Sequence, residues 1–82
     1  MPNFIEIDGV KTSYSPEDTF LVQYAKGKKS HYHTFLVTKG QLPRAVFAYR
    51  TLVGFRKRLV KQEPNRTPGR IRRDEIIRIS GV

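Results

Sequence analysis

The chain has 82 residues, of which 16 are Lys or Arg and 7 are Asp or Glu, which gives a formal net charge of +9 at pH 7. It contains no cysteine, so disulfide scaffolds and thiolate metal sites are excluded. The apolar runs are far shorter than the roughly 20 residues that a membrane-spanning helix needs, so no membrane contact is expected. We therefore expect one domain, residues 1–82, located in the cytoplasm or nucleoid of a cell or inside a virus particle.

The charges are distributed unevenly along the chain. Residues 1–25 contain four acids and one base, a local balance of −3, whereas residues 26–62 contain ten bases and no acid. Such a run repels itself, and an anionic partner that neutralises it gains direct attraction and released counterions. The middle of the chain is thus predicted to contact a polyanion.

The first half of the chain favours short strands. Residues 4–7 and 10–14 flank Asp8-Gly9, a dipeptide that supplies the positive φ angles of a tight hairpin. Residues 15–18 are interpreted as a turn, with a helix beginning at Pro16 as the alternative, and residues 19–25 as a strand of β-favouring side chains. A basic loop at 26–30 then leads into a further strand at 31–38.

Residues 42–62 predict one amphipathic helix about 30 Å long, because at 100° per residue their apolar and basic positions fall on opposite halves. Pro43 suits the first turn, Pro64 lies beyond the end, and Gly54 inside costs about 1 kcal/mol relative to alanine. The basic half would carry Arg44, Arg50, Thr51, Lys57, Arg58 and Lys61. Val46, Val53 and Val60 recur at heptad spacing and would serve a core or the seam of a homodimer.

Two residues depart from this helical pattern. Phe47 falls among the arginines of the basic half, where it would stack on a base, anchor a partner, or be covered by residues 70–80. Arg56 falls within the apolar half beside Tyr49, from which it would reach solvent or pair with an acid such as Glu63 or Asp74.

The tail at 65–82 begins with a turn signal at Thr67-Pro68-Gly69 and alternates arginines with isoleucines. The isoleucines favour a strand, and a short helix ending at Gly81 is the alternative. Arg66, Arg70, Arg72 and Arg73 form a second basic cluster, which would bind phosphate or guanine, or pair with Asp74 and Glu75 and be structural.

His31-Tyr32-His33 is the only constellation with catalytic character, since on one strand both imidazoles would point the same way and could share a metal ion. This tripeptide resembles the His-hydrophobic-His motif of the HUH endonuclease family. The resemblance implies metal-dependent nicking of single-stranded DNA by a helix-borne tyrosine, here Tyr49. The chain departs from that family because no acid lies between Asp18 and Glu63 to complete the metal site. We therefore expect the histidines to belong to a basic or polar surface, with no metal, no cofactor and no enzymatic activity.

The sequence thus predicts an α+β domain, in which a small antiparallel sheet of three to four strands packs on one long amphipathic helix, with a basic C-terminal strand or short helix. Its expected function is non-enzymatic binding of DNA or RNA; neutralising about six phosphates would weaken binding roughly a thousandfold between 50 and 200 mM salt. The alternative is a protein-interaction or structural module, such as a virion component, ribosome-associated protein or small inhibitor, whose basic face docks on an acidic or nucleic-acid-binding protein surface. The candidate contact residues are Lys26, Lys28, Lys29, Tyr32, Arg44, Phe47, Arg50, Lys57, Arg58, Lys61, Arg70, Arg72 and Arg73.

Overall fold

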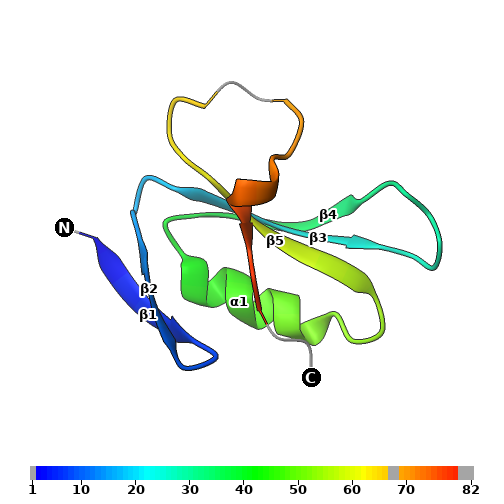
Figure 1. Cartoon of the computed structure of the whole chain (residues 1–82), viewed down its shortest axis with the longest axis horizontal. Helices are drawn as coiled ribbons and strands as arrows, with labels where there is room; N and C mark the ends of the chain where they lie inside the picture. Colours follow the sequence, from blue (N-terminus) through cyan, green and yellow to red (C-terminus); the bar gives the residue numbers. More distant parts are fainter. Residues whose placement is uncertain (1, 67–68, 80–82) are drawn as a thin grey trace.

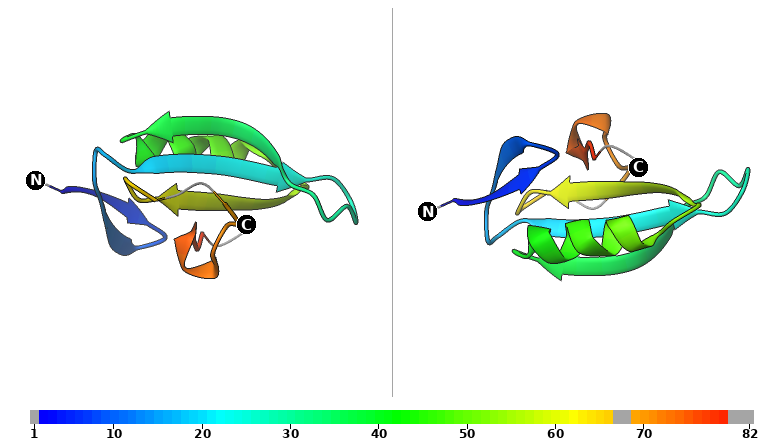
Figure 2. Two further views of the ribbon diagram at one scale, coloured as in Figure 1. Left: turned by 90° about the horizontal axis from the view of Figure 1, so that it is seen from above. Right: turned by 90° about the horizontal axis from the view of Figure 1, so that it is seen from below.

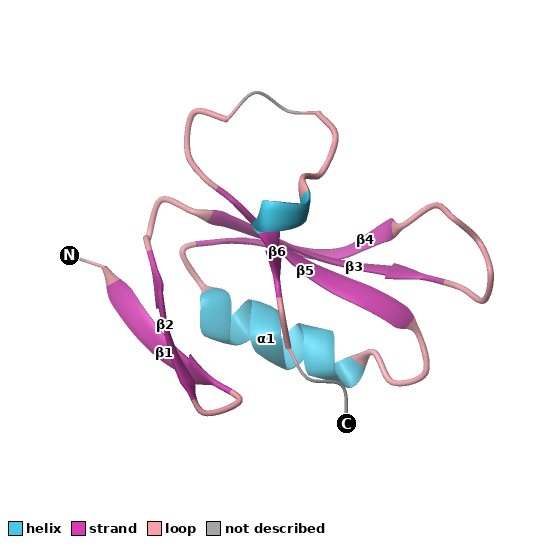
Figure 3. Ribbon diagram, viewed as in Figure 1, coloured by secondary structure: helices cyan, strands magenta, loops and turns pink. Residues whose placement is uncertain are grey.

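A computed structural model describes residues 2–66 and 69–79 of the chain (Figure 1). The fold is α+β, as predicted, with one helix and two antiparallel sheets (Figure 3). The elements in chain order are β1 (Asn3–Ile7), β2 (Val10–Tyr14), β3 (Thr19–Ala25), β4 (His33–Lys39), α1 (Leu42–Thr51), β5 (Arg56–Gln62), the 3-10 helix η1 (Arg73–Glu75) and β6 (Ile76–Ile77).

The N-terminal hairpin confirms the prediction from Asp8-Gly9. Strands β1 and β2 pair antiparallel with Ile7 opposite Val10, and both turn residues have positive φ, 50° at Asp8 and 81° at Gly9. The hairpin forms a sheet of its own beside the main sheet. It is joined to the core by buried Ile7 and by Tyr14, whose ring lies edge-on to Phe20 with 5.9 Å between ring centroids.

The predicted turn at residues 15–18 is also confirmed, and the helical alternative is wrong. The Ser15 amide donates to Oδ2 of Asp18 at 2.9 Å, while the Asp18 amide donates back to the Ser15 carbonyl at 3.1 Å. Gly40 packs against this turn with φ 68°, and a Cβ at that position would lie 2.6 Å from the Pro16 carbonyl oxygen. Only glycine therefore fits this contact without displacement of the backbone.

The main sheet has the strand order β4-β3-β5-β6, and all of its neighbouring strands are antiparallel. Strand β3 is central, as Val22 lies opposite Leu36 of β4 and opposite Leu59 of β5. Helix α1 covers one face of this sheet (Figure 2). The core between them is apolar, with Phe20, Val22, Leu42, Ala45 and Leu59 fully buried.

The long helix predicted for residues 42–62 is wrong, because α1 ends at Thr51 and residues 56–62 form β5. The chain turns between them at Gly54, whose φ of 83° is incompatible with a continuing helix. Ten residues give a helix about 15 Å long, half the predicted length. The basic stripe and the heptad seam therefore do not exist, since Val46 lies on α1, Val53 in the turn that follows it, and Val60 on β5.

The C-terminal segment contains a short strand, though shorter than the one predicted from its isoleucines. Strand β6 pairs Ile76 with Val60 and Ile77 with Leu59, and η1 precedes it. The predicted turn at Thr67-Pro68 and the predicted helix end at Gly81 lie outside the described residues. No helix in the described part of the chain has the length and apolar character needed to cross a bilayer.

Candidate nucleic-acid interface

The two faces of the main sheet differ in what covers them. One face, here called the helix side, packs on α1. The opposite face, here called the open face, carries Leu21, Gln23, Val37, Arg56 and Arg58, which share one side by register and alternation. In Figure 2 the sheet lies between the viewer and α1 in the left view, and β3 and β4 present their open face. Val37 on this face is 56% exposed.

Two arginines of β5 surround the Tyr32 ring at one end of the open face. The guanidinium carbon of Arg58 lies 4.0 Å from the ring centroid, and that of Arg56 lies 5.8 Å away. Arg58 is fixed from behind, since its Nε donates to Oε1 of Gln23 at 2.7 Å and the Gln23 amide donates to Thr34 at 3.3 Å. The chain of contacts orders the Arg58 guanidinium before any ligand arrives.

Arg56 connects β5 to the basic loop that joins β3 and β4. Its Nε donates to the Gly27 carbonyl at 3.2 Å, and its Nη2 donates to the Lys29 carbonyl. Of the two predicted outcomes, Arg56 reaches solvent, and the ion pairs of the described residues do not join it to Glu63 or Asp74. The loop also carries Lys26 and Lys28, and all three of its lysines are exposed.

A groove of about 600 Å³ runs beside Tyr32. Ser30, His31 and Tyr32 come from the β3–β4 loop, Arg58 from β5, and Arg70 and Ile71 from the chain just before η1, so residues far apart in sequence meet here. In Figure 1 the chain just before η1 lies above the sheet on the side away from α1. The residues that line the groove are Ser30, His31, Tyr32, Arg58, Arg70 and Ile71.

The arginine cluster of this site, defined as Arg56, Arg58 and Arg70, has no acidic partner in the part of the chain that the structure describes. Among residues 2–66 and 69–79, the ion pairs join Lys39 to Glu17, Arg50 to Asp8, Arg66 to Glu75, and Arg72 to Asp74 and Glu75. None of them involves the arginine cluster. The positive potential at the groove is therefore not cancelled by a neighbouring carboxylate, and an anionic ligand would be attracted to it.

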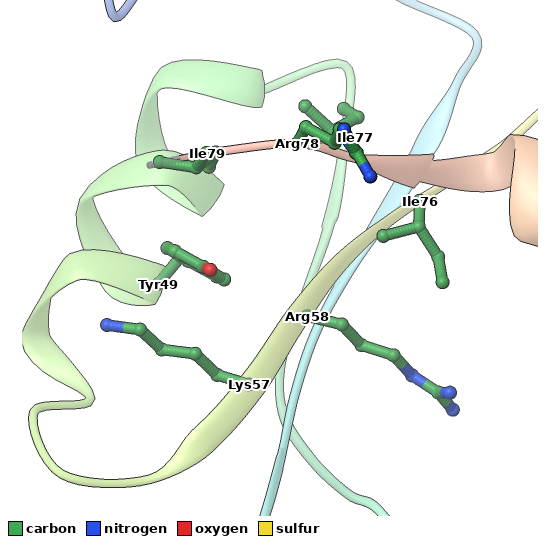
Figure 4. A pocket seen from close by; sticks show the side chains of 7 residues that line it. All are labelled: Tyr49, Lys57, Arg58, Ile76, Ile77, Arg78 and Ile79. Carbon is green, nitrogen blue, oxygen red and sulfur yellow. The ribbon is translucent and has the colours of Figure 1, made fainter. Parts of the chain in front are cut away.

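The basic side chains Lys57 and Arg50, on the helix side, contact other residues of the molecule. Lys57 leaves β5 in the opposite direction from its neighbour Arg58, and its Nζ lies 4.6 Å from the centroid of the Tyr49 ring (Figure 4). Arg50 in α1 pairs with Asp8 of the hairpin turn at 3.5 Å. Burial raises the pKa of the Tyr49 phenol above its usual value, and the Asp8 carboxylate raises it further. A second, smaller pocket of about 380 Å³ lies between Tyr49, β5 and the C-terminal segment.

The structure thus divides the thirteen predicted contact residues into separate groups. The loop lysines, Tyr32, Arg58 and Arg70 lie around the open end of the sheet. Arg44, Phe47 and Arg50 lie on α1, and Lys57 and Lys61 extend from the helix side of β5. The single surface expected from one basic helix is therefore replaced by two surfaces on opposite sides of the sheet.

The C-terminal arginines are partly structural, as the alternative interpretation allowed. Arg66 pairs with buried Glu75 at 2.8 Å, and the Arg72 backbone amide donates to the second oxygen of that carboxylate at 2.8 Å. The Arg72 guanidinium lies 3.9 Å from Asp74 and from Glu75. Arg73 is exposed in η1. Of the predicted cluster, only Arg70 lines the groove.

Sequence reasoning missed Arg56, His31 and Gln23 as parts of this site. No signal in the sequence identified Arg56, because Arg56, Lys57 and Arg58 are three consecutive bases and only a strand assignment places the first and third on one face. Gln23 could not be identified from the sequence, because its role depends on the pairing of β3 with β5, which places it opposite Arg58.

The prediction that His31 and His33 share a strand face is wrong, because β4 begins at His33. His31 lines the groove, whereas the His33 ring packs 5.7 Å from Tyr24. Tyr49, the counterpart of the helix-borne tyrosine of the HUH endonucleases, lies on α1 but is 9% exposed. The described residues contain no group of three or more metal-ligating side chains.

Comparisons of this chain with protein-family models, curated proteins and solved structures give no significant match.

Proposed function

We propose that this protein binds nucleic acid, without catalysing a reaction on it, through the groove and the exposed lysines beside it. The observation that supports this proposal most strongly is the arginine cluster around Tyr32, which has no acidic partner among the described residues. The nucleic acid would be that of a cellular nucleoid, a ribosome or the interior of a virus particle.

Each component of the site has a distinct role in this proposal. Guanidinium groups suit phosphate because they donate in a planar fork, so the arginine cluster would hold the backbone in the groove. The loop lysines, Lys26, Lys28 and Lys29, would act as point charges that attract the strand from a distance. Together these side chains offer six cations. For a single strand, affinity should fall about 300-fold between 50 and 200 mM salt.

The test is a binding titration with fluorescent single-stranded DNA, duplex DNA and RNA at these two salt concentrations. R58Q/R70Q should flatten the slope of log affinity against log salt by about 1.5, since each lost phosphate contact removes somewhat less than one unit. R44Q/R50Q removes the same net charge from α1 and should leave the slope unchanged. Equal effects of the two double variants would show that net charge alone attracts the ligand.

A second candidate function, docking on another protein, is supported by Phe47. This residue lies on the outer side of α1 and is 73% exposed, so the described residues of the C-terminal segment do not cover it, contrary to the interpretation that residues 70–80 would pack over it. A large exposed aromatic side chain between Arg44 and Arg50 has the composition of an interface anchor. We propose that such a partner would present an acidic rim around an apolar pocket.

The substitution F47A separates this candidate from the first. It should abolish a complex with a protein partner and leave nucleic-acid binding unchanged, because Phe47 lies on α1, away from the groove. The fold should tolerate it, since the exposed ring contributes little burial. Pull-down from an extract, followed by the same titration with single-stranded DNA, gives both readouts.

A further inference from the structure

The geometry of the groove indicates which form of nucleic acid it takes. Resting on the function proposed above, we infer that the ligand is a single strand with an unpaired base inserted in the groove, where it stacks on the Tyr32 and Arg58 pair while the arginine cluster and loop lysines hold its phosphates.

The first step is that the groove combines planar groups with cations. A phosphate-binding surface needs only the cations, and an aromatic ring contributes nothing to it. Here Tyr32 and the Arg58 guanidinium lie 4.0 Å apart within the lining of the groove, next to the His31 imidazole. Rings and guanidinium planes are the surfaces on which unpaired bases stack in single-strand complexes. This composition therefore favours a ligand that brings a base as well as a phosphate.

The second step is that the stacking surface is already ordered. Arg58 uses its Nε to donate to Gln23, which leaves the terminal nitrogens of its guanidinium available to donate to a ligand's phosphate or base oxygens. Tyr32 is half-buried beneath Arg58 and Arg56. A base would meet a platform whose rotamers are already fixed, so little side-chain entropy is lost on binding.

The third step is that, within the described part of the chain, neither helix α1 nor the separate β1–β2 hairpin is suited to reading a duplex. Bases in a duplex are covered by their neighbours and are reached through the major groove by a helix or a two-stranded ribbon. The cations of helix α1 are Arg44 and Arg50, and Arg50 pairs with Asp8. The β1–β2 hairpin forms a two-stranded ribbon outside the main sheet, and with Glu6, Asp8 and Lys11 it carries a net charge of −1. Neither element provides a cationic surface for a duplex.

The experiment compares single strands and duplexes of the same sequence, each about 12 nucleotides long, as DNA and as RNA. The wild-type protein should bind the single strand at least about tenfold more tightly than the duplex. Y32L should weaken single-strand binding by about 5- to 150-fold, the range for loss of one stacked base, and Y32F should retain it. Circular dichroism of each variant reports whether it is folded.

A second arm needs no variant of the protein. A single strand in which one position at a time lacks its base should bind the wild type more weakly at the stacked position, by the same factor as Y32L. Y32L should bind the strand with the missing base as tightly as it binds the intact strand, because the substitution and the missing base remove the same stacking contact. The DNA and RNA arms then distinguish the two sources of single strand.

Two outcomes would overturn the inference and are distinguishable from each other. If duplex binds as tightly as single strand and Y32L has no effect, while R58Q/R70Q still weakens binding, the base-insertion model is wrong and the proposed nucleic-acid function stands. If no form of nucleic acid binds with a salt-dependent affinity, the proposed function fails and the inference fails with it.

Discussion

Both sides of the main sheet carry basic side chains next to a tyrosine ring, but the contacts of these side chains differ. On the helix side, Lys57 lies over the Tyr49 ring and Arg50 pairs with Asp8, so cations serve contacts within the molecule. On the open face, Arg56 and Arg58 surround an aromatic ring without a carboxylate partner in the described residues. Lys57 and Arg44 also lack an ion pair among the described residues, so the absence of a carboxylate partner is not confined to the open face. The open end of the sheet differs because its arginines lie together beside a groove of about 600 Å³.

The largest expected effect concerns the wall of the groove that carries Arg70. The Glu75 side chain is 6% exposed and pairs with Arg66, whose side chain is 14% exposed. E75A leaves the arginine with no carboxylate in this pair and also removes the acceptor of the Arg72 amide, so the free energy of unfolding should fall by about 3 kcal/mol. Denaturant titration measures this.

The matched control is E17A, which breaks an ion pair to Lys39 whose two side chains are 64% and 68% exposed. That change should cost less than about 1 kcal/mol, because exposed ion pairs are weak. A similar loss of stability from both variants would show that Glu75 does not hold the C-terminal segment to the sheet.

The next effect concerns the support of Arg58. Q23E places a carboxylate where the Gln23 amide oxygen now accepts from Arg58, and it therefore cancels charge at the groove without altering the packing. Single-strand affinity should fall about tenfold while thermal stability stays the same or rises slightly. Unchanged affinity would mean that Arg58 does not contact the ligand.

A smaller loss of stability is expected when the contacts between Arg56 and the basic loop are removed. R56A removes the side chain that donates to the Gly27 and Lys29 carbonyls, at a cost of about 1 kcal/mol. Amide hydrogen exchange at residues 26–32 should become faster. K57A, at the adjacent position on the helix side, should leave exchange in the loop unchanged, and equal acceleration by both variants would show that the Arg56 contacts do not hold the loop.

The smallest effect tests the helix side. The raised pKa of Tyr49 means that the folded chain holds the phenol proton more tightly than the unfolded chain does. This contribution to stability is complete below about pH 10 and is lost as the pH rises through the folded-state pKa. Y49F should therefore lose less stability than the wild type between about pH 9 and pH 11, and parallel loss in both proteins would contradict a raised pKa.

The sequence predicted the first half of the fold well because its signals are local. Asp8-Gly9 determines a hairpin through its own φ angles, and the β-favouring run at residues 19–25 forms β3 with the predicted ends. The predicted end of the helix was wrong because no local signal identifies β5 as a strand. The middle of β5 is buried on both faces, at Leu59 and Val60, and bases occupy three consecutive positions before it, so the strand lacks the alternation that would distinguish it from a helix.

The candidate site was predictable as a set of residues but not as an arrangement. Lysines in a loop and arginines near Tyr32 are visible in the sequence. Their meeting depends on the antiparallel pairing of β3 with β5, which sets Gln23 opposite Arg58 across 35 positions of the chain. The wall that carries Arg70 depends on the Arg66–Glu75 pair, and no local pattern specifies which acid this arginine selects.

The most direct test of the account is an NMR titration of the ¹⁵N-labelled protein with a single-stranded oligonucleotide of about 12 nucleotides. If the strand binds in the groove, the amide shifts of the residues on α1, Arg44, Phe47 and Arg50, should stay unchanged. The largest changes in amide shift should occur at Ser30, His31, Tyr32, Arg58, Arg70 and Ile71. Shift changes concentrated on α1, with the groove unaffected, would contradict binding in the groove.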